Sequence, residues 1–172
     1  YTGSGVLASA ITMDKDKTKQ IAQSVGIRVP KAYRTVEEIE RFPVIIKPVD
    51  EGSSKGVFLC NNREEAEEAV KKLARPIIED YIVGEELTVG VLNGKALGVL
   101  KIIPQADVLY DYDSKYADGG SIHEFPAKIE DKSYKEAMKI AEKVHSEFGM
   151  KGISRSDFIL SDGELYFLEV NS

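Results

Sequence analysis

The stretch that decides the fold is ISRSDFILSDGELYFLEVNS, residues 153–172, which predicts two strands joined by a tight turn. Side chains alternate between the two faces of a strand. Arg155 and Asp157 therefore share one face of the first strand. In the same way, Glu169 and Asn171 share one face of the second strand. An arginine and three oxygen-bearing side chains thus occur on two neighbouring strands.

The length of the turn decides whether these two polar pairs meet. A three-residue turn at 161–163 would pair Arg155 with Glu169. Asp157 would then lie diagonal to Glu169 on the same face. Gly163 suits the left-handed position that such a turn requires. A two-residue turn would separate the two polar pairs and remove the site.

Converging carboxylate and amide oxygens from Asp157, Glu169 and Asn171 would bind a hard cation, and Mg²⁺ shared with substrate phosphates is the expected ion. The alternative is a solvated polar face on an exposed strand. Leu165 and Phe167 alternate onto the face of Glu169, so we expect that this face is not simply open to solvent. We therefore favour the metal site.

The rest of the chain interleaves helical and strand patterns. Asp14 is a candidate N-cap of one helix, and Asn62 with Glu65 of another. Thr35 with Glu38 resembles a capping box. Periodicity predicts helices over 15–25, 36–41, 63–73 and 133–148, and strands over 44–47, 57–60, 77–80, 86–92, 95–103, 153–160 and 164–170. This mixed order predicts an α+β fold rather than a doubly wound parallel sheet.

A hinge glycine, Gly84, marks the expected internal boundary. It divides the chain into two small lobes, 1–82 with a glycine-bearing loop at 49–56, and 83–172 with a long loop at 104–121 and the terminal hairpin. Long loops are often lids. A cleft between the two lobes is the expected place for a ligand.

Composition limits the classes of partner. The 172 residues carry a formal net charge of −6, which repels phosphate backbones and argues against nucleic-acid binding. No apolar stretch is long enough to predict a membrane span. The single cysteine, Cys60, lies in an apolar run and predicts a buried free thiol, which fits a reducing cytoplasm.

Lysines at element ends form a second feature. Lys47 closes an apolar strand, and residues 51–56 then offer glycines, hydroxyls and backbone N–H groups that can fold over phosphates. Lys15 stands at a helix start, where an anion would meet the positive end of the helix dipole. The alternatives are an ordinary hairpin loop and a surface lysine. Residues 3–8 match G-x-G-x-x-A, but no strand precedes them, so a dinucleotide fingerprint is unsupported.

Taken together, these segments resemble the D-alanine–D-alanine ligases of the ATP-grasp superfamily along nearly the whole chain. The matching strings occur in the family's order, and they are Tyr1-Thr2-Gly3-Ser4-Gly5, Met13-Asp14-Lys15, Ile46-Lys47-Pro48, Glu51-Gly52-Ser53-Ser54, Glu86-Leu87-Thr88-Val89, Tyr110-Asp111-Tyr112, Lys115-Tyr116, Arg155-Ser156-Asp157-Phe158 and Leu168-Glu169-Val170-Asn171. The resemblance implies an ATP-grasp fold with the nucleotide between two α+β lobes. It also implies that the chain is the central and C-terminal part of a longer protein.

The resemblance implies a role for each matching residue. The residues expected to bind the nucleotide are Lys15, Lys47, Ser54, Glu79, Asp80, Tyr81, Ile82, Glu86 and Lys115. Those expected to act in catalysis are Ser53, Arg155, Lys115 and Tyr116. The expected metal ligands are Asp157, Glu169 and Asn171, for two Mg²⁺ ions or Mn²⁺. Within these sets, Lys15 and Lys47 resemble phosphate-binding lysines, and Glu86 the ribose-binding carboxylate.

The implied reaction joins two D-alanine molecules for peptidoglycan synthesis. One carboxylate attacks the γ-phosphate of ATP, and the amine of the second D-alanine attacks the resulting acyl phosphate. The family is cytoplasmic, and we expect a homodimer of the full-length protein. Ser172 stands where the family usually has Thr, and the preceding domain lies outside the sequence. We expect this chain to bind Mg-ATP but to make little dipeptide alone.

Three other classes compete with this interpretation. Another ATP-grasp carboxylate–amine ligase would share the lysines and the metal ligands, but the loops at 51–54 and 110–116 favour the D-alanine enzyme. A nonenzymatic nucleotide-binding module would tolerate the loss of Lys47, Lys115 or the metal ligands, and all of them are present. A purely structural module does not explain polar residues at strand ends.

Overall fold

The computed structural model of the chain describes residues 2–52, 55–104 and 121–172. Contacts divide these residues into two compact units. Unit 1 contains residues 2–29, Val83–Ile103 and Ile122–Ser172, and the described part of unit 2 contains residues 30–52 and 55–82 with Pro104 and Ser121. One break between the two units falls after Ile82, whereas the sequence analysis placed all of residues 1–82 in one lobe. Residues 2–29 nevertheless pack with unit 1, because their apolar side chains join its core.

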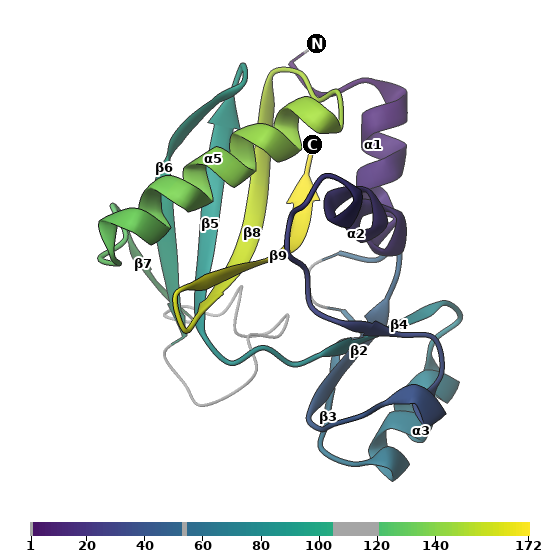
Figure 1. The fold of residues 1–172 in the computed structure, drawn as a ribbon. Coiled ribbons are helices and arrows are strands. Elements are labelled where there is room, and N and C mark those ends of the chain that lie inside the picture. The colour runs from purple at the N-terminus through teal and green to yellow at the C-terminus, as the bar shows by residue number, and fades with distance from the viewer. Residues whose placement is uncertain (1, 53–54, 105–120) are drawn as a thin grey trace. The chain divides into compact units, whose positions relative to one another are not determined.

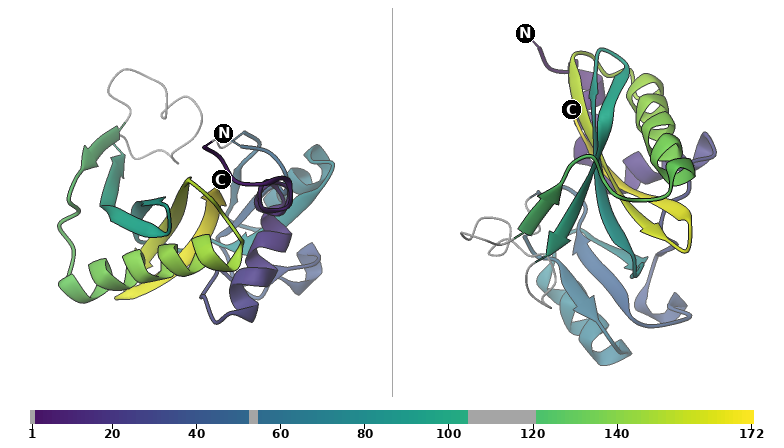
Figure 2. Two further views of the ribbon diagram at one scale, coloured as in Figure 1. Left: turned by 90° about the horizontal axis from the view of Figure 1, so that it is seen from above. Right: turned by 90° about the vertical axis from the view of Figure 1, so that its left-hand side faces the viewer.

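Unit 1 is built on a five-stranded sheet of order β7-β6-β5-β8-β9 (Figure 1). Its elements are α1 (Val6–Met13), α2 (Lys15–Ser24), β5 (Glu85–Leu92), β6 (Lys95–Pro104), β7 (Ser121–Glu124), α5 (Asp131–Glu147), β8 (Ile153–Ser161) and β9 (Glu164–Asn171). β5 pairs antiparallel with β6 and β8, and β8 with β9. α5 lies across one face of the sheet, as Figure 2 shows.

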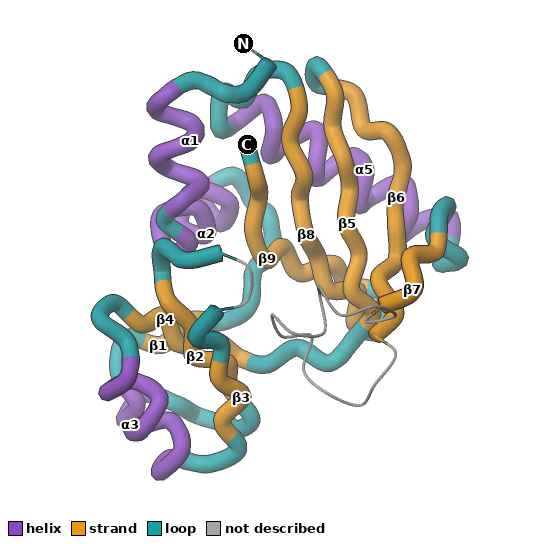
Figure 3. The backbone as a smooth tube through the Cα atoms, turned by 180° about the vertical axis from the view of Figure 1, so that it is seen from behind, coloured by secondary structure: helices purple, strands orange, loops and turns teal. Residues whose placement is uncertain are grey.

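The core of unit 1 lies between α5 and this sheet. α5 buries Ala137, Ala141 and Val144, which follow the helical period that the sequence predicted. Alternate residues of β5, including Leu87 and Val89, are fully buried against them. The opposite face of the sheet carries no such helix in the described part of the chain and is seen in Figure 3. Polar residues are therefore free to occupy it.

The hairpin between β5 and β6 and the start of α2 follow the sequence prediction. Asn93 and Gly94 have φ values of 49° and 79°, as a two-residue turn with a right-handed twist requires. The Asp14 side chain accepts a hydrogen bond from the N–H of Lys17 and caps α2. The sequence did not predict α1, whose N-cap, Gly5, supplies no side-chain hydrogen bond.

Unit 2 is a four-stranded sheet of order β1-β4-β2-β3 with one helix packed on it. Its elements are β1 (Ala32–Tyr33), η1 (Val36–Glu38), β2 (Val44–Pro48), β3 (Phe58–Cys60), α3 (Arg63–Lys72) and β4 (Pro76–Asp80). Val44, Ile46 and Ala66 belong to its core. Cys60 is a buried free thiol, as predicted. Asn62 caps α3 through Glu65 N–H, also as predicted.

The capping box predicted at Thr35 is wrong. The Thr35 side chain makes no capping hydrogen bond, and the segment is a single 3₁₀ turn, Val36–Glu38. Glu38 instead accepts from the backbone N–H of Arg34 at 2.9 Å. The carboxylate therefore closes the turn one residue earlier than a capping box would.

Among the described residues, no helix is long and apolar enough to span a membrane.

Candidate metal and nucleotide sites

The turn of the terminal hairpin differs from the predicted one. Ser161 pairs with Glu164, so the turn has two residues, Asp162 and Gly163. Their φ values are 50° and 78°, and both are in the left-handed region. Such a turn matches the twist of antiparallel strands, and Asp tolerates this conformation better than most residues. The three-residue turn predicted from the sequence is therefore wrong.

A β-bulge at Leu168 restores the meeting of the two polar pairs. Phe158 pairs with Phe167, but Asp157 pairs with Glu169, so Leu168 is an extra residue on β9. Beyond the bulge the alternation of faces is reversed.

The reversal explains the burial along β9. Phe167 and Val170 are both buried in the core although they are three residues apart. Glu169 and Asn171 thus turn to the opposite face, where Arg155 and Asp157 lie. The prediction that Glu169 shares a face with Leu165 and Phe167 is wrong for the same reason.

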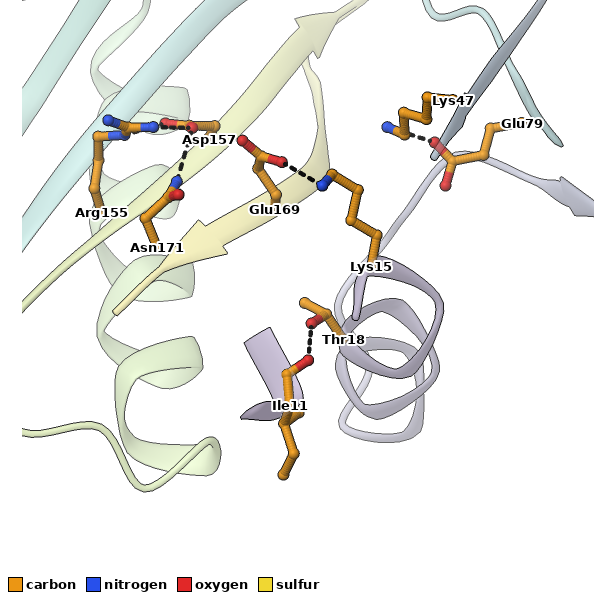
Figure 4. A network of polar contacts seen from close by, with 9 residues as sticks. All are labelled: Ile11, Lys15, Thr18, Lys47, Glu79, Arg155, Asp157, Glu169 and Asn171. Atoms are coloured by element: carbon orange, nitrogen blue, oxygen red, sulfur yellow. Dashed lines mark hydrogen bonds and ion pairs between the residues drawn. The ribbon is translucent and has the colours of Figure 1, made fainter. Parts of the chain in front are cut away.

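Asp157 is the centre of this polar cluster (Figure 4). Arg155 donates to both of its carboxylate oxygens, from Nε at 3.0 Å and from a terminal nitrogen at 2.9 Å. The Thr88 hydroxyl donates to Oδ1 at 2.6 Å. Asn171 Nδ2 lies 3.5 Å from Oδ2. The carboxylate is thereby held from β5, β8 and β9 together.

Lys15 joins the cluster from the start of α2. Its Nζ lies 3.7 Å from Glu169 Oε2, and only 12% of its side chain is exposed. α2 contacts β9, and the Asp14 cap fixes the first turn of the helix beside that strand. The sequence predicted separately that Lys15 binds an anion and that Glu169 binds a cation. The structure brings these two side chains together.

Burial dominates the electrostatics of the cluster. It raises the pKa of the Asp157 carboxyl, while the charge and hydrogen bonds of Arg155 and the hydrogen bond of Thr88 oppose the shift. Burial alone would lower the pKa of Arg155, but Asp157, Glu169 and Glu86 raise it above its ordinary value. Two cations and several carboxylates therefore compensate one another on this face.

The donor set fits Mg²⁺ chemically. Asp157 and Glu169 supply carboxylate oxygens on opposed strands, and Asn171 would supply its amide oxygen after a half-turn of the amide. Within the described ranges, no group of three His, Cys, Asp or Glu side chains has the arrangement of a metal site. A cation here would thus be held by two carboxylates and an amide, and oxygens of water or of phosphates would complete its coordination.

A second ionic pair lies in unit 2. Lys47 Nζ is 3.0 Å from Glu79 Oε2 (Figure 4). Glu79, on β4, is 2% exposed and pairs with Ile45 of β2. Ile45 and Lys47 point to the same face of the sheet, so Glu79 shares that face with Lys47. The sequence placed both residues in the nucleotide set, and the structure brings them into contact.

The Asp80 carboxylate lies within unit 2 at the end of β4. Tyr33 donates its hydroxyl to Oδ1 at 2.7 Å, and Arg41 Nε donates to Oδ2 at 3.2 Å. Burial and then the hydrogen bond to Asp80 raise the pKa of Tyr33 to about 12. Both oxygens of this buried carboxylate are therefore engaged within unit 2.

Comparisons with known proteins identify the chain's family. A family model described as D-ala D-ala ligase C-terminus matches residues 10–172. The chain belongs to this family.

Its relatives carry the same name. It is 92% identical over 172 residues to a D-alanine–D-alanine ligase of Fusobacterium nucleatum, covering all of this chain and 60% of that protein. It is 42% identical to a D-alanine–D-alanine ligase of Sinorhizobium fredii, covering all of this chain and 61% of that protein. The chain thus spans about 60% of the length of the curated relatives it matches.

Solved ligase structures share the fold. A D-alanine–D-alanine ligase of Bacillus anthracis is 29% identical, with a TM-score of 0.83, over 99% of this chain and 60% of that one. The VanG D-Ala:D-Ser ligase of Enterococcus faecalis is also 29% identical, with a TM-score of 0.85, over 99% and 55% of the two chains. These likenesses confirm the predicted α+β, ATP-grasp fold.

Several residues of the predicted ligase site remain to be placed. Glu86 lies on β5 two residues from Thr88, so both share the open face with Asp157. Tyr81 is 36% exposed and Ile82 is half-buried. The predicted residues that lie outside the described part of the chain are Ser53, Ser54, Lys115 and Tyr116. The position of a nucleotide between two lobes also stays a prediction.

The sequence reading missed Thr88, although a signal was present. Strand alternation places it on the face of Glu86, and the antiparallel register sets it directly opposite Asp157. In the sequence analysis Thr88 entered only as part of the string Glu86-Leu87-Thr88-Val89 that resembles the family. The hydroxyl was recognisable as a partner only once the register was known.

Proposed function

We propose that the full-length protein containing this chain joins two D-alanine molecules to D-alanyl-D-alanine and converts ATP to ADP and phosphate. The observation that carries the proposal is the polar cluster on the open face of unit 1, where Asp157, Glu169 and Asn171 lie with Arg155 and Lys15. The ligase named in Fusobacterium nucleatum, at 92% identity, supports this choice of substrate. The product is a peptidoglycan precursor.

ATP and Mg²⁺ are the proposed cosubstrate and metal. A structure of the Bacillus anthracis ligase complexed with ATP is 28% identical to this chain, with a TM-score of 0.78, which supports the nucleotide. Asp157, Glu169 and Asn171 would hold two Mg²⁺ ions, for which Mn²⁺ could substitute. Bound there, Mg²⁺ would neutralise charge on the phosphates and polarise the γ-phosphoryl group.

The cations of the chain stabilise the two successive transition states. In the first step a D-alanine carboxylate oxygen bonds to the γ-phosphorus, and ADP leaves. In the second step the amine of the other D-alanine bonds to the acyl carbon, loses a proton, and phosphate leaves. Arg155, with 54% of its side chain exposed, can turn from Asp157 to the acyl phosphate, and Lys15 can turn from Glu169 to a phosphate. Both cations belong to the same polar cluster as the proposed metal ligands, so they would act on the phosphates that the metal binds.

Further residues are proposed to contact the nucleotide. Lys47 would bind a phosphate, the segment from Glu79 to Ile82 the adenine, and Glu86 the ribose. The Lys47–Glu79 pair supports this role, because it places an ammonium group 3.0 Å from a buried carboxylate, with 14% of the lysine side chain exposed. Ser53, Ser54, Lys115 and Tyr116 complete the proposed set. We also propose a cytoplasmic homodimer of the full-length protein.

The test is ADP release by the full-length protein with Mg-ATP and candidate substrates, given singly and in pairs. D-alanine alone should stimulate ADP release, with D-alanyl-D-alanine as the product, and L-alanine should not. A D-alanyl-D-serine product from a mixture of D-alanine and D-serine would instead favour the activity for which the VanG D-Ala:D-Ser ligase is named. Stimulation by an unrelated acid and amine would keep the mechanism and reject the substrate. Tight Mg-ATP binding with no turnover would favour a regulatory module.

A further inference from the structure

Thr88 lies directly across the strand pair from Asp157. The register of β5 and β8 makes them cross-strand partners, and the next partner along the same row, on β9, is Glu169. The Thr88 hydroxyl donates to Asp157 Oδ1 at 2.6 Å, the shortest of the hydrogen bonds to this carboxylate. A charged acceptor at this distance marks a strong hydrogen bond.

The donors to Asp157 differ in how firmly they are placed. Arg155 has a long side chain that is 54% exposed, and it is proposed above to turn toward a phosphate. Asn171 Nδ2 lies at the limit of hydrogen bonding, 3.5 Å from Oδ2. Thr88 has one side-chain torsion, which β-branching restricts, and it belongs to a central strand of the sheet. Thr88 is thus the donor that would remain when a cation replaces the others.

We infer that Thr88 is a positioning residue for the metal ligand Asp157. It holds Oδ1 and thereby leaves Oδ2, the oxygen nearer to Asn171, to face a divalent cation. Asp157 is 9% exposed, so no solvent shell would orient the carboxylate in place of the hydroxyl. This inference rests on the metal role proposed above, and it assigns to Thr88 the choice of the ligating oxygen.

The test is the affinity of the full-length protein for Mn²⁺ alone, read from the EPR signal of free Mn²⁺. Thr88→Val keeps the shape of the side chain and removes the donor, and the loss of a partner to a ligating carboxylate typically weakens metal binding about 10–100-fold. We expect a dissociation constant raised by about that factor. Thr88→Ser keeps the hydroxyl and should retain most of the affinity. Rescue by serine separates positioning from packing.

Two further variants fix the interpretation. Ser156→Ala removes a fully buried hydroxyl on the other face of β8, for which the described residues supply no hydrogen-bond partner, and it should leave Mn²⁺ binding unchanged. Asp157→Asn should abolish Mn²⁺ binding at this site. If Mn²⁺ binding is unchanged in Thr88→Val but lost in Asp157→Asn, the role of Thr88 is rejected and the metal site is kept. Unchanged binding in Asp157→Asn would reject the metal site itself, and the role of Thr88 with it.

Folding is checked by circular dichroism for every variant. If Thr88→Val does not fold, Thr88→Ala replaces it, and the comparison with Thr88→Ser is made in the same way. A tenfold or larger difference between alanine and serine supports the inference, and equal affinities contradict it.

Discussion

At Asp157, a carboxylate that is 9% exposed meets an arginine, a threonine and an asparagine from three adjacent strands. The sequence predicted that Arg155 and Asp157 share a face, because alternation along one strand needs no knowledge of the fold. It could not predict Thr88, since a cross-strand contact depends on the register between distant segments. The residues that share a face of one strand can thus be predicted from the sequence, whereas contacts between neighbouring strands are much harder to predict.

Tyr33 stabilises the buried Asp80 carboxylate, and its loss should be costly. Tyr33→Phe removes one donor from an acceptor that is 4% exposed, so we expect the free energy of unfolding to fall by about 1–3 kcal/mol. The control is Tyr166→Phe, whose ring lies under the Arg28 guanidinium and whose substitution should change stability by less than about 0.5 kcal/mol. Urea denaturation of the full-length protein measures both. Equal midpoints for the two variants would contradict the role of Tyr33.

His145 should make the stability of unit 1 sensitive to acid. It is 5% exposed on α5, and burial lowers its pKa below 6.5 while Ser154 Oγ lies 2.8 Å from its Nδ1. As pH falls below 6.5, the unfolded chain takes up a proton that the folded chain resists, so stability falls until the folded pKa is passed.

The measurement for His145 is the melting temperature of the full-length protein between pH 8 and about 5, the range in which an imidazole titrates. His145→Gln should reduce the fall in melting temperature at acid pH. The control His123→Gln, on β7, should show the same fall as the parent protein. Identical pH profiles for the parent and His145→Gln would show that this histidine contributes nothing to the acid sensitivity.

Helices and turns were predicted correctly where residues close in sequence determine how they begin or reverse direction. α2 and α3 begin at side-chain caps, and the β5–β6 turn contains Asn93-Gly94, so short-range rules were sufficient. α1 has no such cap and was missed. The bulge at Leu168 depends on packing, although the spacing of the buried residues at 165, 167 and 170 was a readable signal of reversed alternation.

Two single deletions test this account of the bulge. Without Leu168, β9 pairs regularly, and Glu169 and Asn171 keep both their partners and their face. Deletion of Leu168 should therefore preserve Mn²⁺ binding. Deletion of Val170 should instead turn Asn171 toward the core and abolish it. Circular dichroism checks that both variants fold, and loss of Mn²⁺ binding in the folded Leu168 deletion would contradict the assigned register.

At the scale of the whole molecule, the chain is two α+β units that represent about 60% of the relatives' length. The α+β class could be predicted because helices and hairpins alternate in the sequence. The membership of residues 2–29 in unit 1 could not, since it depends on core contacts between segments more than fifty residues apart. The proposed chemistry places the cation-binding oxygens and Arg155 in unit 1, and Lys47 with the base-binding segment in unit 2.

The most direct test of the central claim follows the carboxylate oxygen of D-alanine. The full-length protein is incubated with Mg-ATP and D-alanine labelled with ¹⁸O in its carboxylate, and the released phosphate is examined by ³¹P NMR. Attack of the carboxylate on the γ-phosphate predicts one ¹⁸O in each phosphate and loss of one from each dipeptide. Phosphate without ¹⁸O, formed together with ADP, would contradict carboxylate activation and the function proposed for this chain.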